Sequence, residues 1–148
     1  MHLLTSILIR GMRLRGAGEG CEPFANEFDS HISPQSRIIM RLYIAVLDDV
    51  PDFIVPTLVA HTILNAHRFF EEISSAEYKY WLANSFKKCV IRVNKKEFTK
   101  IADIPFTYTG YENTTLGGIK SCAIPVPRKN EELPNVLKFA KLWKPTCS

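Results

Sequence analysis

Over the larger, C-terminal part of the chain, apolar residues form short runs separated by polar turns. Residues 42–47 are a continuous apolar run with β-branched and aromatic members, which predicts a strand buried on both faces. A polar turn follows at 48–52, and Pro56 suits the first turn of a helix because its missing donor costs nothing there. Apolar positions then recur at helical spacing, so a helix with a broad buried face is predicted over 56–71.

The middle of the chain continues with a second helix, a second strand and a short third helix. The second helix is predicted over 76–86, where aromatic residues recur and Ser74-Ser75 offers an N-cap. Residues 89–93 predict the second strand. Asn94 is then placed to cap a short helix that ends near Ile101.

Two further strands and one long helix complete the pattern. Residues 105–109 predict an outer strand, because Pro105 at its start cannot donate to a sheet ladder. A polar loop spans 110–118, and residues 121–126 predict the last strand. The final helix is predicted over 130–144, where lysines gather towards the C-terminus and complement the helix dipole.

This order of elements predicts an α/β fold, in the form of a single three-layer α/β/α domain with a mixed sheet of about four strands. The regular pattern begins at Met40, so residues 40–148 are assigned to this domain. Residues 1–39 lack sustained periodicity, and we interpret them as a disordered leader or an over-extended gene start. A short amphipathic docking helix over 2–15 is the competing interpretation.

The composition is that of an ordinary globular protein with a mild basic excess. An apolar content of 46% and a charged content of 23% argue against a wholly disordered chain. The four arginines of residues 1–39 balance four acidic residues, so the whole net charge of +4 belongs to residues 40–148. A basic excess of this size permits contact with phosphate backbones without requiring it.

The cysteines and the apolar runs indicate the expected compartment. Neither zinc-knuckle nor CxxC spacing occurs among the four cysteines, which predicts free thiols in a reducing cytoplasm. These cysteines are Cys21, Cys89, Cys122 and Cys147. No apolar run approaches the roughly 20 residues that span a bilayer. We therefore expect a cytoplasmic protein with no membrane contact, no metal site and no cofactor.

Carboxylates and a histidine lie near the end of the first predicted strand. Asp48, Asp49 and Asp52 follow it, at the edge where open α/β sheets collect ligands. Adjacent carboxylates there could bind Mg²⁺ or act as a general base, or they could form a helix cap and a solvated turn. His61, one or two turns into the first helix, could act as an acid or base, or it could be a hydrogen-bonded core residue.

The loop and a set of basic residues offer a second kind of chemistry. Backbone donors of the loop, together with Thr114 and Thr115, could hold a phosphate or an oxyanion, although a plain connecting turn has the same composition. The basic residues assigned to nucleic-acid contact are Lys87, Lys88, Arg92, Lys95, Lys96 and Lys120. With aromatic residues at 78–81 beside them, they suit a nucleic-acid backbone and an unstacked base, and a solvated helix face would have the same pattern.

Over roughly residues 41–143 the chain resembles the type II peptidyl-tRNA hydrolases. The resemblance rests on the first strand and turn, on Val59-Ala60-His61, on residues 89–93, and on the segment 108–118 with the apolar strand after it. It implies an enzyme that hydrolyses the ester between peptide and tRNA without a metal, and that holds tRNA on a basic surface. It also implies the fold, independently of the activity.

The residues and the resemblance together suggest a candidate catalytic set, and the chain departs from the family pattern at two positions. The candidate catalytic residues are His61, Asp49, Thr114 and Thr115. Ile54 stands where the family has a lysine, and Tyr108 stands where it has an aspartate. Three functions stay open: a peptidyl-tRNA hydrolase, a catalytically degenerate binding protein of the same fold, and a different small-molecule enzyme that uses the Asp48/Asp49 edge. The expected partner is tRNA or peptidyl-tRNA, and a homodimer is compatible with each function.

Overall fold

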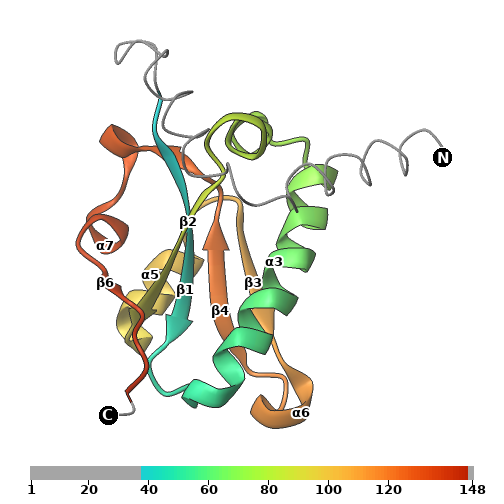
Figure 1. The fold of residues 1–148 in the computed structure, drawn as a ribbon, viewed down its shortest axis with the longest axis vertical. Coiled ribbons are helices and arrows are strands. Elements are labelled where there is room, and N and C mark those ends of the chain that lie inside the picture. The colour runs from blue at the N-terminus through green and yellow to red at the C-terminus, as the bar shows by residue number, and fades with distance from the viewer. Residues whose placement is uncertain (1–37, 147–148) are drawn as a thin grey trace, which may run out of the picture. The chain divides into compact units, whose positions relative to one another are not determined.

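The computed structural model describes residues 38–146, and the predictions for residues 1–37 lie outside this range. A mixed sheet of six strands forms the centre of the domain (Figure 1). Its strands are β1 (Met40–Leu47), β2 (Lys87–Val93), β3 (Thr107–Tyr111), β4 (Lys120–Pro125), β5 (Arg128–Lys129) and β6 (Lys141–Leu142). The predicted α/β class with a mixed sheet is confirmed, and the sheet has six strands instead of about four.

The strand order is β3-β4-β1-β2-β6, and the short β5 also pairs with β1. β1 and β2 are parallel, and the other pairings are antiparallel. A parallel pair needs a long crossover connection. The crossover consists of α3 (Val55–Glu72), α4 (Ala76–Tyr80) and the π-helical turn η3 (Trp81–Ser85). Together α4 and η3 form the second helix that the sequence predicts.

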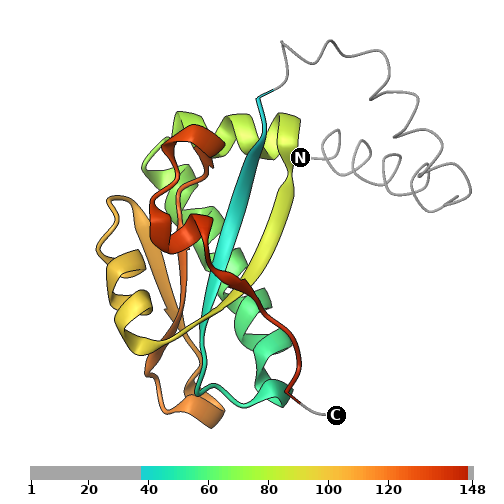
Figure 2. The ribbon, with the colours of Figure 1, turned by 90° about the vertical axis from the view of Figure 1, so that its left-hand side faces the viewer.

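Helices cover both faces of the sheet. α3 packs along one face, and α5 (Lys95–Ala102) lies on the other face with α7 (Asn135–Lys138), as Figures 1 and 2 show from two directions. The remaining helical segments are η2 (Asp52–Ile54), α6 (Asn113–Leu116) and η4 (Asn130–Glu132). The predicted three-layer arrangement is therefore present.

α3 has the broad buried face that its sequence predicts. The buried residues recur every three or four positions and are Val55, Leu58, Thr62, Ala66 and Phe70. β1 is buried along almost its whole length, as expected for a strand with neighbours on both sides. The main core lies where this face of α3 meets the sheet.

Asn94 caps α5 as predicted. Its side chain accepts a hydrogen bond from the Glu97 N–H at 2.8 Å, and the Glu97 carboxylate accepts one from the Asn94 N–H at 3.1 Å. This reciprocal capping box satisfies two backbone donors of the helix start. Asn94 is the single residue between the end of β2 and the start of α5.

The prediction of one long final helix over 130–144 is wrong. Leu133 precedes Pro134 and is extended (φ −71°, ψ 128°), because the proline ring disfavours a helical backbone at the residue before it. Only η4 and α7 are helical, and β6 then pairs with β2. The Trp143 N–H continues this pairing by donating to Val90 O at 2.9 Å.

The edge strand predicted over 105–109 begins later, at Thr107. Pro105 and Phe106 form the turn before it, and Phe106 has a left-handed φ of 61°. The strand extends through Tyr111 into the segment predicted as a loop, and α6 occupies the middle of that segment. β3 is an edge strand, as predicted.

Candidate functional site

The segments that carry the predicted catalytic residues lie at one end of the sheet. In Figure 1 the end of β1, the first turn of α3 and α6 are all at the lower end. Gly110 lets β3 approach α3 closely, because a methyl group added to it would lie 2.5 Å from Thr62 Oγ1. The turn of α3 that carries His61 therefore lies beside the end of β3.

The three aspartates at this end have different surroundings. Asp48 and Asp49 are exposed. Asp52 accepts hydrogen bonds from the N–H and the hydroxyl of Thr146 at 2.5 and 2.8 Å, and from Arg92 at 3.3 Å. These contacts, the one from the Thr146 N–H foremost, lower the pKa of Asp52. Asp52 therefore anchors the C-terminal segment, while Asp49 is exposed and has no such partner in the described range.

His61 is an exposed side chain and not a core residue. Its Nε2 lies 3.3 Å from Nδ2 of Asn65, one helical turn further along α3. The adjacent Thr62 is the buried residue of this turn, and its hydroxyl donates to Leu58 O at 2.7 Å. Among residues 38–146, no group of three or more His, Cys, Asp or Glu side chains is placed to hold a metal ion.

Thr114 and Thr115 belong to α6, and their backbone donors are already engaged. The Glu112 carboxylate accepts hydrogen bonds from the N–H groups of Thr114, Thr115 and Leu116 at 2.8, 2.6 and 3.2 Å. These bonds, chiefly the one from Thr115, lower the pKa of Glu112, so the carboxylate is ionised at neutral pH. The predicted oxyanion donors are thus occupied by a negative charge of the chain itself. An acidic residue directly before a helical turn is the sequence signal for this cap.

The basic residues assigned to nucleic-acid contact do not form one patch. Lys87 and Lys88 begin β2, whereas Lys95 and Lys96 lie beyond its other end. A strand rises about 3.3 Å per residue, so roughly 20 Å of strand separates the two pairs. Lys120 begins β4 and lies at the end of the sheet where β1 stops, because β4 runs antiparallel to β1.

Arg92 has partners within the fold. It donates to Lys144 O at 2.7 Å and to Asp52 Oδ1 at 3.3 Å, and its guanidinium lies 5.3 Å from the centroid of the Trp143 ring. These contacts attach β2 to the segment that follows β6. Its predicted contact with a phosphate would have to replace them.

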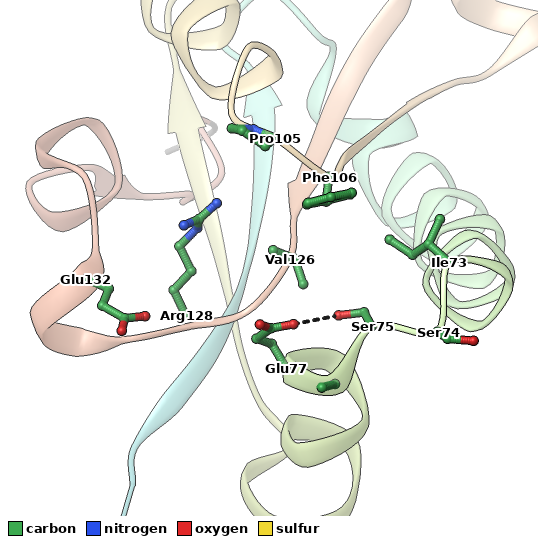
Figure 3. A pocket seen from close by; sticks show the side chains of 10 residues that line it. Ile73, Ser74, Ser75, Glu77, Pro105, Phe106, Val126, Arg128 and Glu132 are labelled. Atoms are coloured by element: carbon green, nitrogen blue, oxygen red, sulfur yellow. Dashed lines mark hydrogen bonds between the residues drawn. The ribbon is translucent and has the colours of Figure 1, made fainter.

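A cavity of about 500 Å³ lies at the opposite end of the sheet (Figure 3). Three segments that are distant in sequence line it: Ile73–Glu77 after α3, Pro105 and Phe106 before β3, and Val126, Arg128 and Glu132 after β4. This volume lies within the range of small-molecule sites. None of the residues that the sequence singles out for catalysis lines this cavity.

Charged and hydroxyl groups converge on this cavity. Ser75 donates to the Glu77 carboxylate at 3.3 Å, as Figure 3 shows. Arg128 forms no ion pair with a carboxylate of residues 38–146, and its buried Nε has no hydrogen-bond partner in that range. Buried polar groups in folded proteins are normally paired, so the Arg128 side chain has charge and hydrogen-bonding capacity that residues 38–146 leave unsatisfied.

Two residues of the cavity wall have left-handed backbone conformations. Ser74 has a φ of 52° and Phe106 a φ of 61°. Such conformations cost roughly 1–3 kcal/mol in non-glycine residues, and they occur preferentially at ligand sites. Within residues 38–146 only one other non-glycine residue, Phe86, has a positive φ. The strain of this domain is therefore concentrated around the cavity and the nearby η3–β2 junction.

The two cysteines of the described range are free thiols, as predicted for them. Cys122 is fully buried in β4, and burial raises its pKa to about 12. Burial also raises the pKa of Cys89. A protonated thiol is a poor nucleophile, so neither cysteine is a candidate catalytic residue.

Comparisons of the chain with protein-family models, with curated proteins and with solved structures found no match. Among residues 38–146, no helix combines the length and the apolar character needed to cross a membrane. The function is therefore inferred from the two ends of the sheet, one with the predicted catalytic residues and one with the cavity.

Proposed function

We propose that this domain is a ligand-binding protein that has the architecture implied by the resemblance to type II peptidyl-tRNA hydrolases but does not hydrolyse peptidyl-tRNA. The observation that carries this proposal is the position of Glu112. Its carboxylate holds the three backbone donors that could otherwise stabilise an oxyanion. The proposal corresponds to the catalytically degenerate alternative among the functions that the sequence leaves open.

The electrostatics of α6 oppose ester hydrolysis. Oxyanion donors act when they lie about 2.7–3.1 Å from the oxygen that becomes negative in the transition state. Here the donors point at an ionised carboxylate, and freeing them would break three charge-assisted hydrogen bonds. A substrate oxygen that developed negative charge beside Glu112 would be repelled by it.

The two departures from the family pattern have packing roles. Ile54 is partly buried against the core. Tyr108 packs against Phe69, with ring centroids 5.7 Å apart. Neither residue supplies the amine or the carboxylate that the resemblance implies. His61 then has Asn65 as its neighbour, and within residues 38–146 no carboxylate is bonded to it.

The direct test is the release of peptide from peptidyl-tRNA by the purified protein. We expect a rate no faster than the spontaneous reaction, because the backbone donors are occupied by Glu112 and two of the implied side chains are absent. An active peptidyl-tRNA hydrolase added to the same substrate is the positive control. Release above the spontaneous rate that is lost in His61→Asn would overturn the proposal, since an exposed histidine without a catalytic role should not affect turnover.

Binding of tRNA is a second candidate function, and the residues at the start of β2 favour it. The Phe86 ring is 56% exposed, and its backbone is left-handed with a φ of 56°. Lys88 Nζ lies 3.2 Å from the centroid of that ring, and Trp81 packs beside it at 5.3 Å. An exposed aromatic ring next to an ammonium group can stack an unpaired base and contact its phosphate.

We expect Phe86→Ala and Lys88→Gln each to weaken tRNA binding at low salt. Lys88→Gln should also reduce, by about one, the magnitude of the slope of the logarithm of the tRNA association constant against the logarithm of the salt concentration. The matched control is Phe139→Ala with Lys138→Gln, another exposed phenylalanine beside a lysine, with 5.8 Å between Lys138 Nζ and the ring. Filter binding across a salt series measures both effects. An equal loss of tRNA affinity in the test pair and in the control pair would show that any surface lysine beside a phenylalanine suffices. The second candidate function would then be abandoned.

A further inference from the structure

We propose that the cavity at the end of α3 binds a small zwitterion, a molecule with a carboxylate, an ammonium group and an apolar frame, such as a free amino acid or a short peptide. The inference rests on the proposed function in one respect, which is that the ligand is bound and not hydrolysed. It names the class of ligand for a cavity at the end of the sheet remote from His61 and Thr114.

Arg128 supplies the contact for the carboxylate. It extends from β5 towards Pro105 and away from the carboxylates of Glu77 and Glu132 (Figure 3). A planar guanidinium binds a carboxylate through two parallel hydrogen bonds, and no carboxylate of residues 38–146 is paired with it. The unpaired Nε marks donor capacity that the described part of the fold leaves unused.

Glu77 and Glu132 supply the contact for the ammonium group. The wall thus contains two negative charges and one positive charge, and they are not paired with one another. A purely anionic ligand would meet Arg128 but would be repelled by the two glutamates. A ligand with both signs of charge satisfies all three groups, and Ser75 holds the Glu77 side chain from behind.

The rest of the cavity suits a hydrocarbon frame. Ile73, Phe106 and Val126 contribute apolar surface, and Phe106 is held with 62% of its surface exposed. A neighbouring cavity of about 290 Å³ shares Glu77 and Arg128 and adds the side chains of Ile38 and Met40. The same cavity is also lined by Lys129 and Glu132. Arg128 and Glu77 therefore line both cavities, which leaves room for a side chain of the ligand on each side of the charged groups.

The test is calorimetric titration of the full chain with four compounds: L-leucyl-L-leucine, L-leucine, N-acetyl-L-leucine and L-leucinamide. The first two are zwitterions, the third lacks the ammonium group and the fourth lacks the carboxylate. We expect the zwitterions to bind at least about tenfold more tightly than either blocked compound, since each blocked form loses a charged hydrogen bond. Equal affinity for all four compounds, or no binding of either zwitterion at millimolar concentration, would overturn the inference.

Variants assign the two charges to their residues. Arg128→Gln should weaken the binding of the zwitterions and of N-acetyl-L-leucine about tenfold and leave the binding of L-leucinamide unchanged. Glu77→Gln should weaken the binding of the zwitterions and of L-leucinamide and leave the binding of N-acetyl-L-leucine unchanged. Arg68→Gln, an exposed arginine on α3 outside the cavity, is the matched control and should bind as wild type. Arg128→Lys keeps the positive charge but cannot form two parallel hydrogen bonds with a carboxylate, so it should bind the zwitterions with intermediate affinity. Unfolding midpoints identify any variant that has lost its fold, and a folded Arg128→Gln or Arg128→Lys variant with unchanged affinity would overturn the inference.

The outcomes separate this inference from the proposed function. Zwitterion binding together with release of peptide from peptidyl-tRNA would overturn the non-hydrolytic function and leave the ligand class standing. An absence of both would overturn the ligand class and leave the non-hydrolytic function standing.

Discussion

Replacing Phe70 with alanine is expected to lower the free energy of unfolding by about 3–5 kcal/mol. Phe70 is completely buried on α3, and its ring is stacked on Tyr78 of α4 with 4.7 Å between the centroids. Truncation removes the apolar contacts of a whole ring and leaves a cavity that the surrounding core cannot fill. Because a domain of this size has about 5–15 kcal/mol of total stability, the loss is a large fraction of it.

The measurement is equilibrium unfolding in urea, followed by circular dichroism. Phe139→Ala is the matched control, because that ring is 74% exposed and its removal should change stability by no more than about 0.5 kcal/mol. The Phe70 variant should also weaken ligand binding in the cavity, since Tyr78 follows the wall residues Ser75 to Glu77 directly. If Phe70→Ala lowered the free energy of unfolding by less than about 1 kcal/mol, Phe70 would not be the residue that holds α4 against α3.

Gly110→Ala is the second substitution with a large expected effect. It should lower the free energy of unfolding by about 1–3 kcal/mol, because the added methyl group overpacks the contact between β3 and α3. A methyl group at this position would lie 2.5 Å from Thr62 Oγ1 and 2.6 Å from Thr62 Cγ2. Thr62 cannot rotate away freely, because it is buried and its hydroxyl is bonded to Leu58 O. The strand and the helix must therefore separate to accommodate the methyl group.

Thr62→Ala provides the control for this clash through a double-mutant cycle. Alone it loses a buried hydrogen bond and a methyl group, at a cost of about 1 kcal/mol or more. In the Thr62→Ala background Gly110→Ala should cost much less, because both clashing atoms are gone and only the Cβ at 3.0 Å remains. An equal cost of Gly110→Ala in both backgrounds would place the strain elsewhere than at the contact between β3 and α3.

Several parts of this protein follow from its sequence alone. The apolar run of 42–47, the helical periodicity after Pro56 and the capping residue Asn94 identify β1, α3 and α5. Each signal involves residues that are at most a few turns apart, so local geometry is sufficient to interpret it. The α/β class with helices on both faces follows from the order of these elements.

The tertiary structure decided where the site lies and how the C-terminal part pairs. The lysine-rich amphipathic pattern of 130–144 predicts a helix, but Pro134 interrupts it. Residues 141–142 instead form a strand that pairs with the free edge of β2. The donors at Thr114 and Thr115 appear free in the sequence, and only the folded turn shows that Glu112 occupies them.

The cavity is the clearest case of a feature that the sequence could not reveal. Ser75, Phe106 and Arg128 are separated by tens of residues, and no local pattern relates a serine cap, a turn before an edge strand and an arginine after β4. They meet because β3 begins, and β4 ends, where α3 stops. The sequence by itself determined the elements of this protein, because helices and strands depend on neighbouring residues. The ligand site was decided by the tertiary structure, because it depends on which ends of those elements meet.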